Sequence, residues 1–115
     1  MKTTHQQKVL LNKLCAAFGF DSMNDRQTII TRDNCNEGCR EKIDTLKPDI
    51  IRHYPKDFTR KLRSGKRDPK SNLTILRECL RFHHRHLVSI RHFKWCKKTK
   101  KSIGVYKYYI REKRK

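Results

Sequence analysis

Cysteines and histidines lie four positions apart at three places in this chain: Cys79 with His83, His92 with Cys96, and Cys35 with Cys39. Zinc prefers four thiolate or imidazole ligands in a tetrahedron. However, the Cys-x2-Cys knuckle of specific zinc motifs is absent. His92 and Cys96 also fall in a predicted strand, where residues i and i+4 are about 13 Å apart. We therefore expect no metal or other cofactor, and burial of the thiols as small hydrophobic groups is the alternative. The candidate zinc ligands are Cys35, Cys39, Cys79 and His83.

The ionisable residues give little support to catalysis. Three histidines cluster at His83, His84 and His86, but the nearest carboxylate is Glu78 alone. The chain has no nucleophile motif and no Gly-rich phosphate loop. The acids that precede this region have the positions of a helix cap and a solvated helix face: Asp33, Glu37, Glu41 and Asp44. We therefore predict that the protein is not an enzyme.

Positive charge is the strongest chemical signal. The chain has 115 residues and a formal net charge of +19. Residues 1–50 hold eight Lys and Arg against seven Asp and Glu, whereas residues 51–115 hold 22 against four. Self-repulsion on this scale destabilises a compact domain that has no polyanion bound to it. We expect a near-neutral scaffold over 1–50, a basic binding half over 51–110, and nucleic acid as the partner.

Other partners and compartments fit the sequence less well. No run approaches the roughly 18 apolar residues that span a bilayer, so we expect no membrane partner. Asn12 and Lys13 interrupt the apolar patch near the N-terminus, which argues against a signal peptide. We therefore expect an intracellular protein, in a nucleus or a virion and not secreted, with its five cysteines reduced.

A helix that runs into a β-hairpin must position most of these cations. Ser71 has the position of an N-cap before a predicted main helix over 71–86. Its apolar face comprises Leu73, Leu76, Leu80 and then His83 or Leu87, and its polar face comprises Thr74, Arg77, Arg81 and Arg85. From Val88 the pattern becomes that of strands over 88–95 and 103–110, joined by a Lys-rich loop.

The remaining segments complete a single small α+β domain over 1–110, because two cores would be marginal at this length. We expect a helix over 5–18 ended by Gly19 and a short edge strand at 27–31 that pairs with the hairpin. We further expect a helix from Cys35, capped by Asp33 or Asn34 and ended near Leu46 by Pro48. A short basic helix over 55–63 and a flexible basic tail at 111–115 follow.

This order of elements resembles the winged helix, a helix-turn-helix variant with a β-hairpin wing after its recognition helix. The resemblance is architectural, covers nearly the whole chain and involves no specific motif. It implies that residues 71–86 enter the major groove of DNA and that the wing contacts the backbone or minor groove. The wing tip would be Lys97, Lys98, Lys100 and Lys101. The additional helix at 55–63 and the long link from 46 to 55 depart from the family pattern.

The predicted function is the binding of duplex DNA, as a transcriptional regulator or a DNA-packaging or architectural protein. The oligomeric state stays open between a monomer and a homodimer. The predicted contacts are basic residues and one threonine: Arg60, Arg63, Lys66, Arg67, Lys70, Thr74, Arg77, Arg81, Arg85, Lys97, Lys98, Lys100 and Lys101.

The alternative function is that of a structural RNA-binding component of a ribonucleoprotein or virion. In that case the hairpin aromatics would stack on unpaired bases. These aromatics are Phe93, Trp95, Tyr106, Tyr108 and Tyr109. The competing interpretation, which we favour for most of them, is that they form the hairpin's share of the core.

Overall fold

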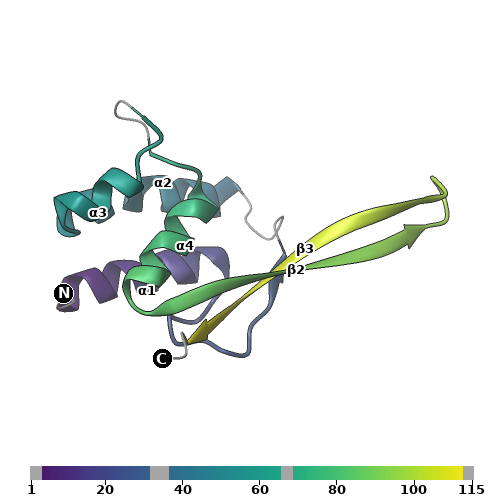
Figure 1. The fold of residues 1–115 in the computed structure, drawn as a ribbon, viewed down its shortest axis with the longest axis horizontal. Helices are drawn as coiled ribbons and strands as arrows, with labels where there is room; N and C mark the ends of the chain where they lie inside the picture. The colour runs from purple at the N-terminus through teal and green to yellow at the C-terminus, as the bar shows by residue number, and fades with distance from the viewer. Residues whose placement is uncertain (1–3, 32–36, 66–68, 113–115) are drawn as a thin grey trace.

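The computed structural model describes residues 4–31, 37–65 and 69–112. Within them the elements follow the order α1 (His5–Phe18), β1 (Ile30–Thr31), α2 (Glu37–His53), α3 (Lys56–Lys61), α4 (Asn72–Phe82), β2 (Arg85–Cys96) and β3 (Lys101–Glu112). The helices form a head, and the β2–β3 hairpin projects from it (Figure 1). The predicted α+β class is confirmed. None of the helices in the described ranges has the length and apolar character needed to cross a membrane.

Helix α1 forms as the sequence predicts. The Thr4 hydroxyl accepts the backbone N–H of Gln7, and the Gln7 side chain accepts that of Thr4, so two free donors at the helix start are satisfied. The apolar face is buried: Leu10, Leu11, Leu14, Cys15 and Phe18. Gly19 ends the helix with a φ of 109°, a left-handed conformation that costs glycine little.

Helix α2 runs through Pro48, so the predicted end near Leu46 is wrong. An interior proline removes one backbone hydrogen bond and costs about 3 kcal/mol. Ile43 and Ile50, on either side of it, are both fully buried. Tyr54, directly after the helix, is buried too, and such burial is worth about 1.5–3 kcal/mol for each large apolar side chain. The helical spacing of apolar residues continues across the proline. The burial of these side chains therefore outweighs the cost of Pro48. The predicted cap at Asp33 and Asn34 lies outside the described residues.

The next two helices differ from their predictions only in length. Phe58 in helix α3 and Leu62 directly after it are buried as expected. Helix α4 ends at Phe82, whereas a main helix over 71–86 was predicted. His84 has a φ of 60°, which breaks the helix and lets Arg85 begin β2, three residues before the predicted strand. This early turn allows Leu87 to point into the core as a strand residue.

The sheet is antiparallel with the order β1–β3–β2. Ile30 pairs with Tyr108, so the prediction of a short edge strand that pairs with the hairpin is confirmed. Strand β3 continues to Glu112, which pairs with Arg85. Arg111 and Glu112 therefore belong to the sheet, although a flexible tail from 111 was predicted. Residues 113–115 lie outside the described ranges.

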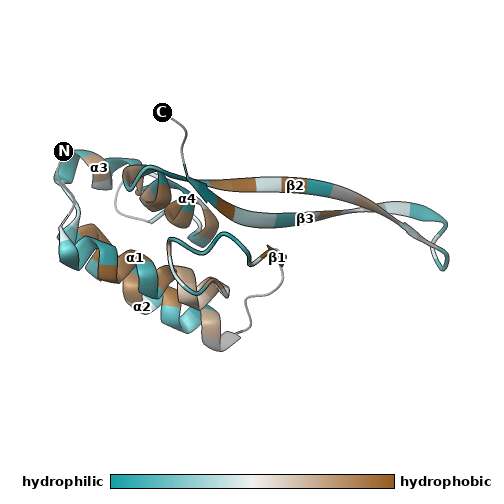
Figure 2. Ribbon diagram, turned by 90° about the horizontal axis from the view of Figure 1, so that it is seen from below, coloured by the Kyte–Doolittle hydropathy of each residue, from teal (hydrophilic) through white to brown (hydrophobic). Residues whose placement is uncertain are grey.

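The core ends part of the way along the hairpin. Leu87, Tyr108 and Ile110 are buried with the helices, but the strands continue beyond them (Figure 2). We call residues 91–106 the arm, because among the described residues β1 ends opposite Lys107, and β2 and β3 alone continue from Arg91 onward. The arm gives the molecule its long axis of 50 Å against 34 and 24 Å across.

Candidate nucleic-acid interface

The arm is a two-stranded ribbon with a cationic tip. Its register runs from the pair Arg91–Tyr106 to the pair Cys96–Lys101, and residues 97–100 form the loop. The arm sequence holds six Lys and Arg and no Asp or Glu. All four lysines of the predicted wing tip are exposed: Lys97, Lys98, Lys100 and Lys101. The arm therefore presents positive charge that no carboxylate within it offsets.

One face of the arm is aromatic. Side chains two positions apart in a strand share a face, so Arg91, Phe93 and Trp95 stand together. Opposite Arg91 on the same face is Tyr106. Phe93 is 67% exposed, Trp95 63% and Tyr106 36%, so the expectation that most of the hairpin aromatics join the core is wrong for these three. Tyr108 does join it.

Arg91 connects this face. Its guanidinium carbon lies 4.7 Å from the ring centre of Phe93 and 5.5 Å from that of Tyr106. Gly104, which pairs with Phe93, makes space for this, because a Cβ at Gly104 would come within 3.0 Å of Arg91 Nε. We call Arg91, Phe93, Trp95 and Tyr106 the aromatic face. The alternating pattern of residues 88–95 predicted a strand, but neither the contacts of Arg91 nor the exposure of the rings.

The predicted recognition helix offers less to a ligand than its sequence indicated. Thr74 and Arg77 are half-buried, and the Thr74 hydroxyl hydrogen-bonds that of Ser71 at 2.8 Å. Arg81 is exposed but forms an ion pair with Glu78 at 3.3 Å. Among the predicted contacts on α4, only Arg81 is therefore exposed.

Arg85 lies on β2 and not on the predicted helix face. Its Nε donates to Asn24 Oδ1 at 3.0 Å, and its Nη1 donates to the His83 carbonyl. These bonds join the loop after α1 to the start of the hairpin. Arg85 is therefore occupied by the fold, and nothing in the sequence pattern indicated Asn24 as its partner.

The other predicted cations lie away from the arm. Arg60 is exposed on α3, and Arg63 and Lys70 are half-buried near it. Figure 1 shows α3 at the end of the head opposite the tip of the arm, and Figure 2 agrees. Lys66 and Arg67 lie outside the described residues. The structure thus brings the four tip lysines together but separates them from the cations of α3 and α4.

Two of the candidate zinc ligands belong to the core. His83 Nε2 lies 2.9 Å from the Tyr54 hydroxyl, which also donates to the Gln7 carbonyl at 3.2 Å. Burial lowers the pKa of His83 to about 4 and raises the pKa of the Cys79 thiol above its usual range. A buried thiol of this kind resists forming the thiolate that binds zinc. The surroundings of Cys79 and His83 are therefore those of core residues and not those of a metal site.

The remaining cysteines do not complete a metal site within the described ranges, which contain no group of three metal-binding side chains. Cys39 is disulfide-bonded, so the prediction of five reduced thiols is wrong at this residue. Cys15 and Cys79 are free and buried. Cys35 and the side chains of His92 and Cys96 lie outside the described part.

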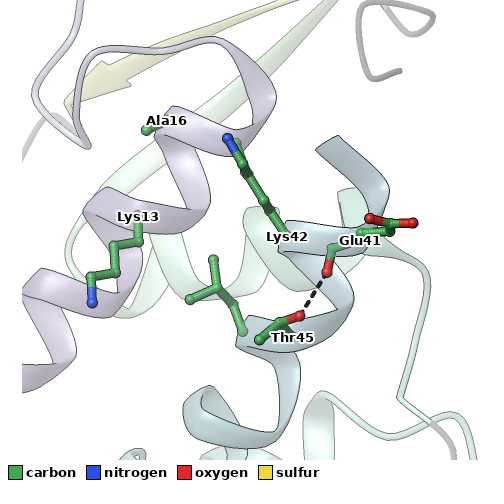
Figure 3. Close-up of a pocket in the computed structure, with 7 residues that line it drawn as sticks. Lys13, Ala16, Glu41, Lys42 and Thr45 are labelled. Atoms are coloured by element: carbon green, nitrogen blue, oxygen red, sulfur yellow. Dashed lines mark hydrogen bonds between the residues drawn. The ribbon is translucent and has the colours of Figure 1, made fainter. Parts of the chain in front are cut away.

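A groove of about 660 Å³ lies between α1 and α2 (Figure 3). Its lining combines Lys13 and Lys42 with Glu41, and the apolar part of the lining is Ala16, Ala17 and Leu46. The Thr45 hydroxyl donates to the Glu41 carbonyl at 2.9 Å. Charges of both signs and a lack of converging polar groups give this groove no clear ligand chemistry.

The comparisons with known proteins do not assign a family. No family model, curated protein or solved structure matches this chain. The arm and the distribution of charge are therefore the observations from which a function must be inferred.

Proposed function

We propose that this protein binds nucleic acid through its arm, with duplex DNA as the partner, and that it is a transcriptional regulator or a DNA-packaging or architectural protein and not an enzyme. The observation that carries the proposal is a projecting ribbon with six Lys and Arg and no acidic residue. The four exposed tip lysines would contact phosphates first.

The physical basis is counterion release. Each lysine that neutralises a phosphate frees a condensed cation, so affinity falls with salt by a slope of about 0.9 per contact. A major groove about 12 Å wide admits a two-stranded β-ribbon. The arm has this form from Arg91–Tyr106 to its tip. The tip would then contact the backbone that borders the groove.

A winged-helix-like mode of docking is the finer part of the proposal. The order of helices and strands, with a hairpin directly after α4, supports it. The partial burial of Thr74 and Arg77 and the ion pair of Arg81 weaken α4 as the main contact. We therefore propose that the arm supplies most of the binding and that α4 contributes through Arg81.

The second candidate is a structural RNA-binding component of a ribonucleoprotein or virion. The exposed rings of Phe93 and Trp95 favour it, because single-stranded RNA presents unstacked bases to aromatic side chains. It differs from the first candidate in the expected preference for structured RNA over duplex DNA.

Two variants of equal charge test the role of the arm. In the first, Lys97, Lys98, Lys100 and Lys101 are changed to Ala. In the matched control, four exposed lysines of the head are changed to Ala: Lys8, Lys13, Lys42 and Lys56. Binding to a random-sequence blunt duplex is measured by fluorescence anisotropy across salt concentrations.

We expect the arm variant to lose about 3.6 from the slope of log affinity against log salt if all four lysines contact phosphates. The head variant should change the slope by less than about 0.9, which is the value for one phosphate contact. Equal losses would mean that binding follows net charge and not the arm. No binding by the unchanged protein to duplex DNA, single-stranded DNA or hairpin RNA would overturn the proposed function.

A further inference from the structure

We infer that the aromatic face of the arm is a stacking platform for unpaired nucleobases, so that the preferred ligand is a nucleic acid with a single-stranded segment. The inference rests on the proposed binding of nucleic acid through the arm, and it adds a single-stranded segment to the duplex as the part of the ligand that the aromatic face binds. It concerns Arg91, Phe93, Trp95 and Tyr106, of which Phe93 and Trp95 are about two-thirds exposed.

Exposure of these rings lacks a structural explanation within the chain. Among the described residues, none of these three rings packs against another aromatic ring, although the rings of Tyr54, Phe58 and Phe82 in the head pack closely together. Large exposed apolar groups that lie side by side mark binding surfaces. The two most exposed rings stand on neighbouring positions of one strand face.

The spacing of the rings suits a flat ligand. Side chains two residues apart on a strand are about 6.8 Å apart, which is twice the spacing of about 3.4 Å between bases along one strand of a duplex. One base therefore fits between Phe93 and Trp95. The Arg91 guanidinium already lies over the Phe93 ring, 4.7 Å from its centre. Stacking on such surfaces is tolerant of sequence, because every base has a π face.

The cations beside the rings favour a nucleic acid over other occupants. A second copy of the arm would bring six more Lys and Arg against the same face, and like charges repel. Insertion into a lipid surface needs apolar groups at the end that enters first. Here that end is the loop Lys97–Lys98–Thr99–Lys100, which is polar and exposed. A single strand offers both the bases for the rings and the phosphates for the lysines.

The chain supplies its own reporter, because Trp95 is its only tryptophan. The unchanged protein is titrated at low salt with a single-stranded oligonucleotide of DNA, its RNA equivalent, a blunt duplex, inorganic polyphosphate and anionic phosphatidylserine vesicles. We expect strong quenching of Trp95 fluorescence, with protection from acrylamide, for the single strands of either sugar. Polyphosphate, which has charge but no bases, should bind without this change.

Matched variants separate stacking from charge. Phe93→Leu and Trp95→Leu remove the rings and keep an apolar strand residue, and each should weaken single-strand binding about tenfold or more. Binding of polyphosphate should stay unchanged. Ile29→Leu, at a residue of the head that is 57% exposed, is the control and should change neither affinity. Thermal unfolding of each variant verifies that it is folded.

The possible failures are distinguishable. Tight binding of single strands without any change at Trp95, or with full affinity in the Leu variants, would overturn the stacking platform and leave the proposed function intact. A change in Trp95 fluorescence with vesicles but not with oligonucleotides would assign the aromatic face to lipid. This result would also overturn the stacking platform. An absence of binding to every nucleic acid would overturn both proposals.

Discussion

The head and the arm differ in the interactions that stabilise them. Every buried hydrophobic side chain that the structure describes lies outside residues 91–106. The described ion pairs also lie outside the arm, and one of them joins Arg26 to Glu112 at the base of the hairpin. The arm has backbone pairing, exposed rings and exposed lysines at its tip instead. Residues of the head are thus explained by folding, whereas those of the arm need another explanation.

The residues that folding does not explain are the first candidates for function, and here they lie in the arm. A two-stranded hairpin is marginally stable by itself, so the arm depends on its base being fixed in the head. Leu87, Tyr108 and Ile110 fix that base in the core. Changes in the arm are therefore expected to affect binding and changes in the head to affect stability.

The largest expected effect tests this division directly. Leu76 in α4 is fully buried, and Leu76→Ala should lower the free energy of unfolding by about 2–5 kcal/mol through lost burial and a cavity. Trp95→Leu removes an aromatic ring from the arm. It should change the free energy of unfolding by less than about 0.5 kcal/mol. Urea unfolding followed by circular dichroism measures both. A loss above 1 kcal/mol in the arm variant would show that the arm is part of the cooperative core.

A second prediction concerns pH and sharpens the description of the head. Burial, assisted by the positive charges of Arg85 and Lys8, lowers the pKa of His83 to about 4, against about 6.5 in an unfolded chain. Between pH 6.5 and 4 the unfolded state therefore binds a proton that the folded state does not. Stability should fall across this window as pH is lowered, by at most about 3 kcal/mol.

His83→Gln should remove most of this slope, since its amide does not titrate, and His84→Gln at the exposed neighbour should keep it. Below this window Asp25 adds a further loss. Hydrogen bonds from Thr28, and from the backbone N–H groups of Asp21 and Gln27, hold the pKa of its carboxyl well below the usual range. The measurement is urea unfolding at half-unit steps of pH. An unchanged slope in His83→Gln would assign the acid sensitivity to another group.

Local periodicity predicted much of the fold. The apolar spacing in 5–18, the turn at Gly19 and the β-branched runs of the hairpin specify their structures with short-range information. The errors occurred where tertiary burial outweighed a local rule. Pro48 lies inside α2 because Ile43 and Ile50 are both buried, and α4 ends early because Leu87 belongs to the sheet. A short window of sequence does not show, in either case, that burial in the folded protein will outweigh the local rule.

The candidate site was only partly predictable for a related reason. Composition identified the cations of the hairpin, and Lys97, Lys98 and Lys100 lie in the loop as predicted, whereas Lys101 begins β3. The pattern of 88–95 does not show how far along the hairpin the core extends, so the exposure of Phe93 and Trp95 was missed. Nor does a helical pattern show that Arg77 is half-buried and that Arg81 has a partner.

A third prediction asks whether the head binds nucleic acid at all. Arg77→Glu with Arg81→Glu reverses two charges on α4, and from the sequence alone this change is expected to abolish duplex binding. If the arm supplies most of the binding, the loss should be about tenfold, or about 1.4 kcal/mol, because Arg81 is exposed and Arg77 is half-buried. Fluorescence anisotropy at one salt concentration measures it. Complete loss in a folded variant would restore α4 as the recognition helix.

The smallest expected effect compares the same backbone strain in the two regions. His84 at the base and Lys100 at the tip both have a left-handed φ, of 60° and 52°, which is unfavourable for residues with a Cβ. Glycine relieves this strain but adds freedom to the unfolded chain, so His84→Gly should raise the free energy of unfolding by about 0.5–1 kcal/mol. Lys100→Gly relieves equal strain where the chain has no core contact. Its gain should therefore be confined to the arm, as slower amide hydrogen exchange near the loop, with the global unfolding midpoint unchanged. Equal shifts of the midpoint in both variants would mean that head and arm unfold as one unit.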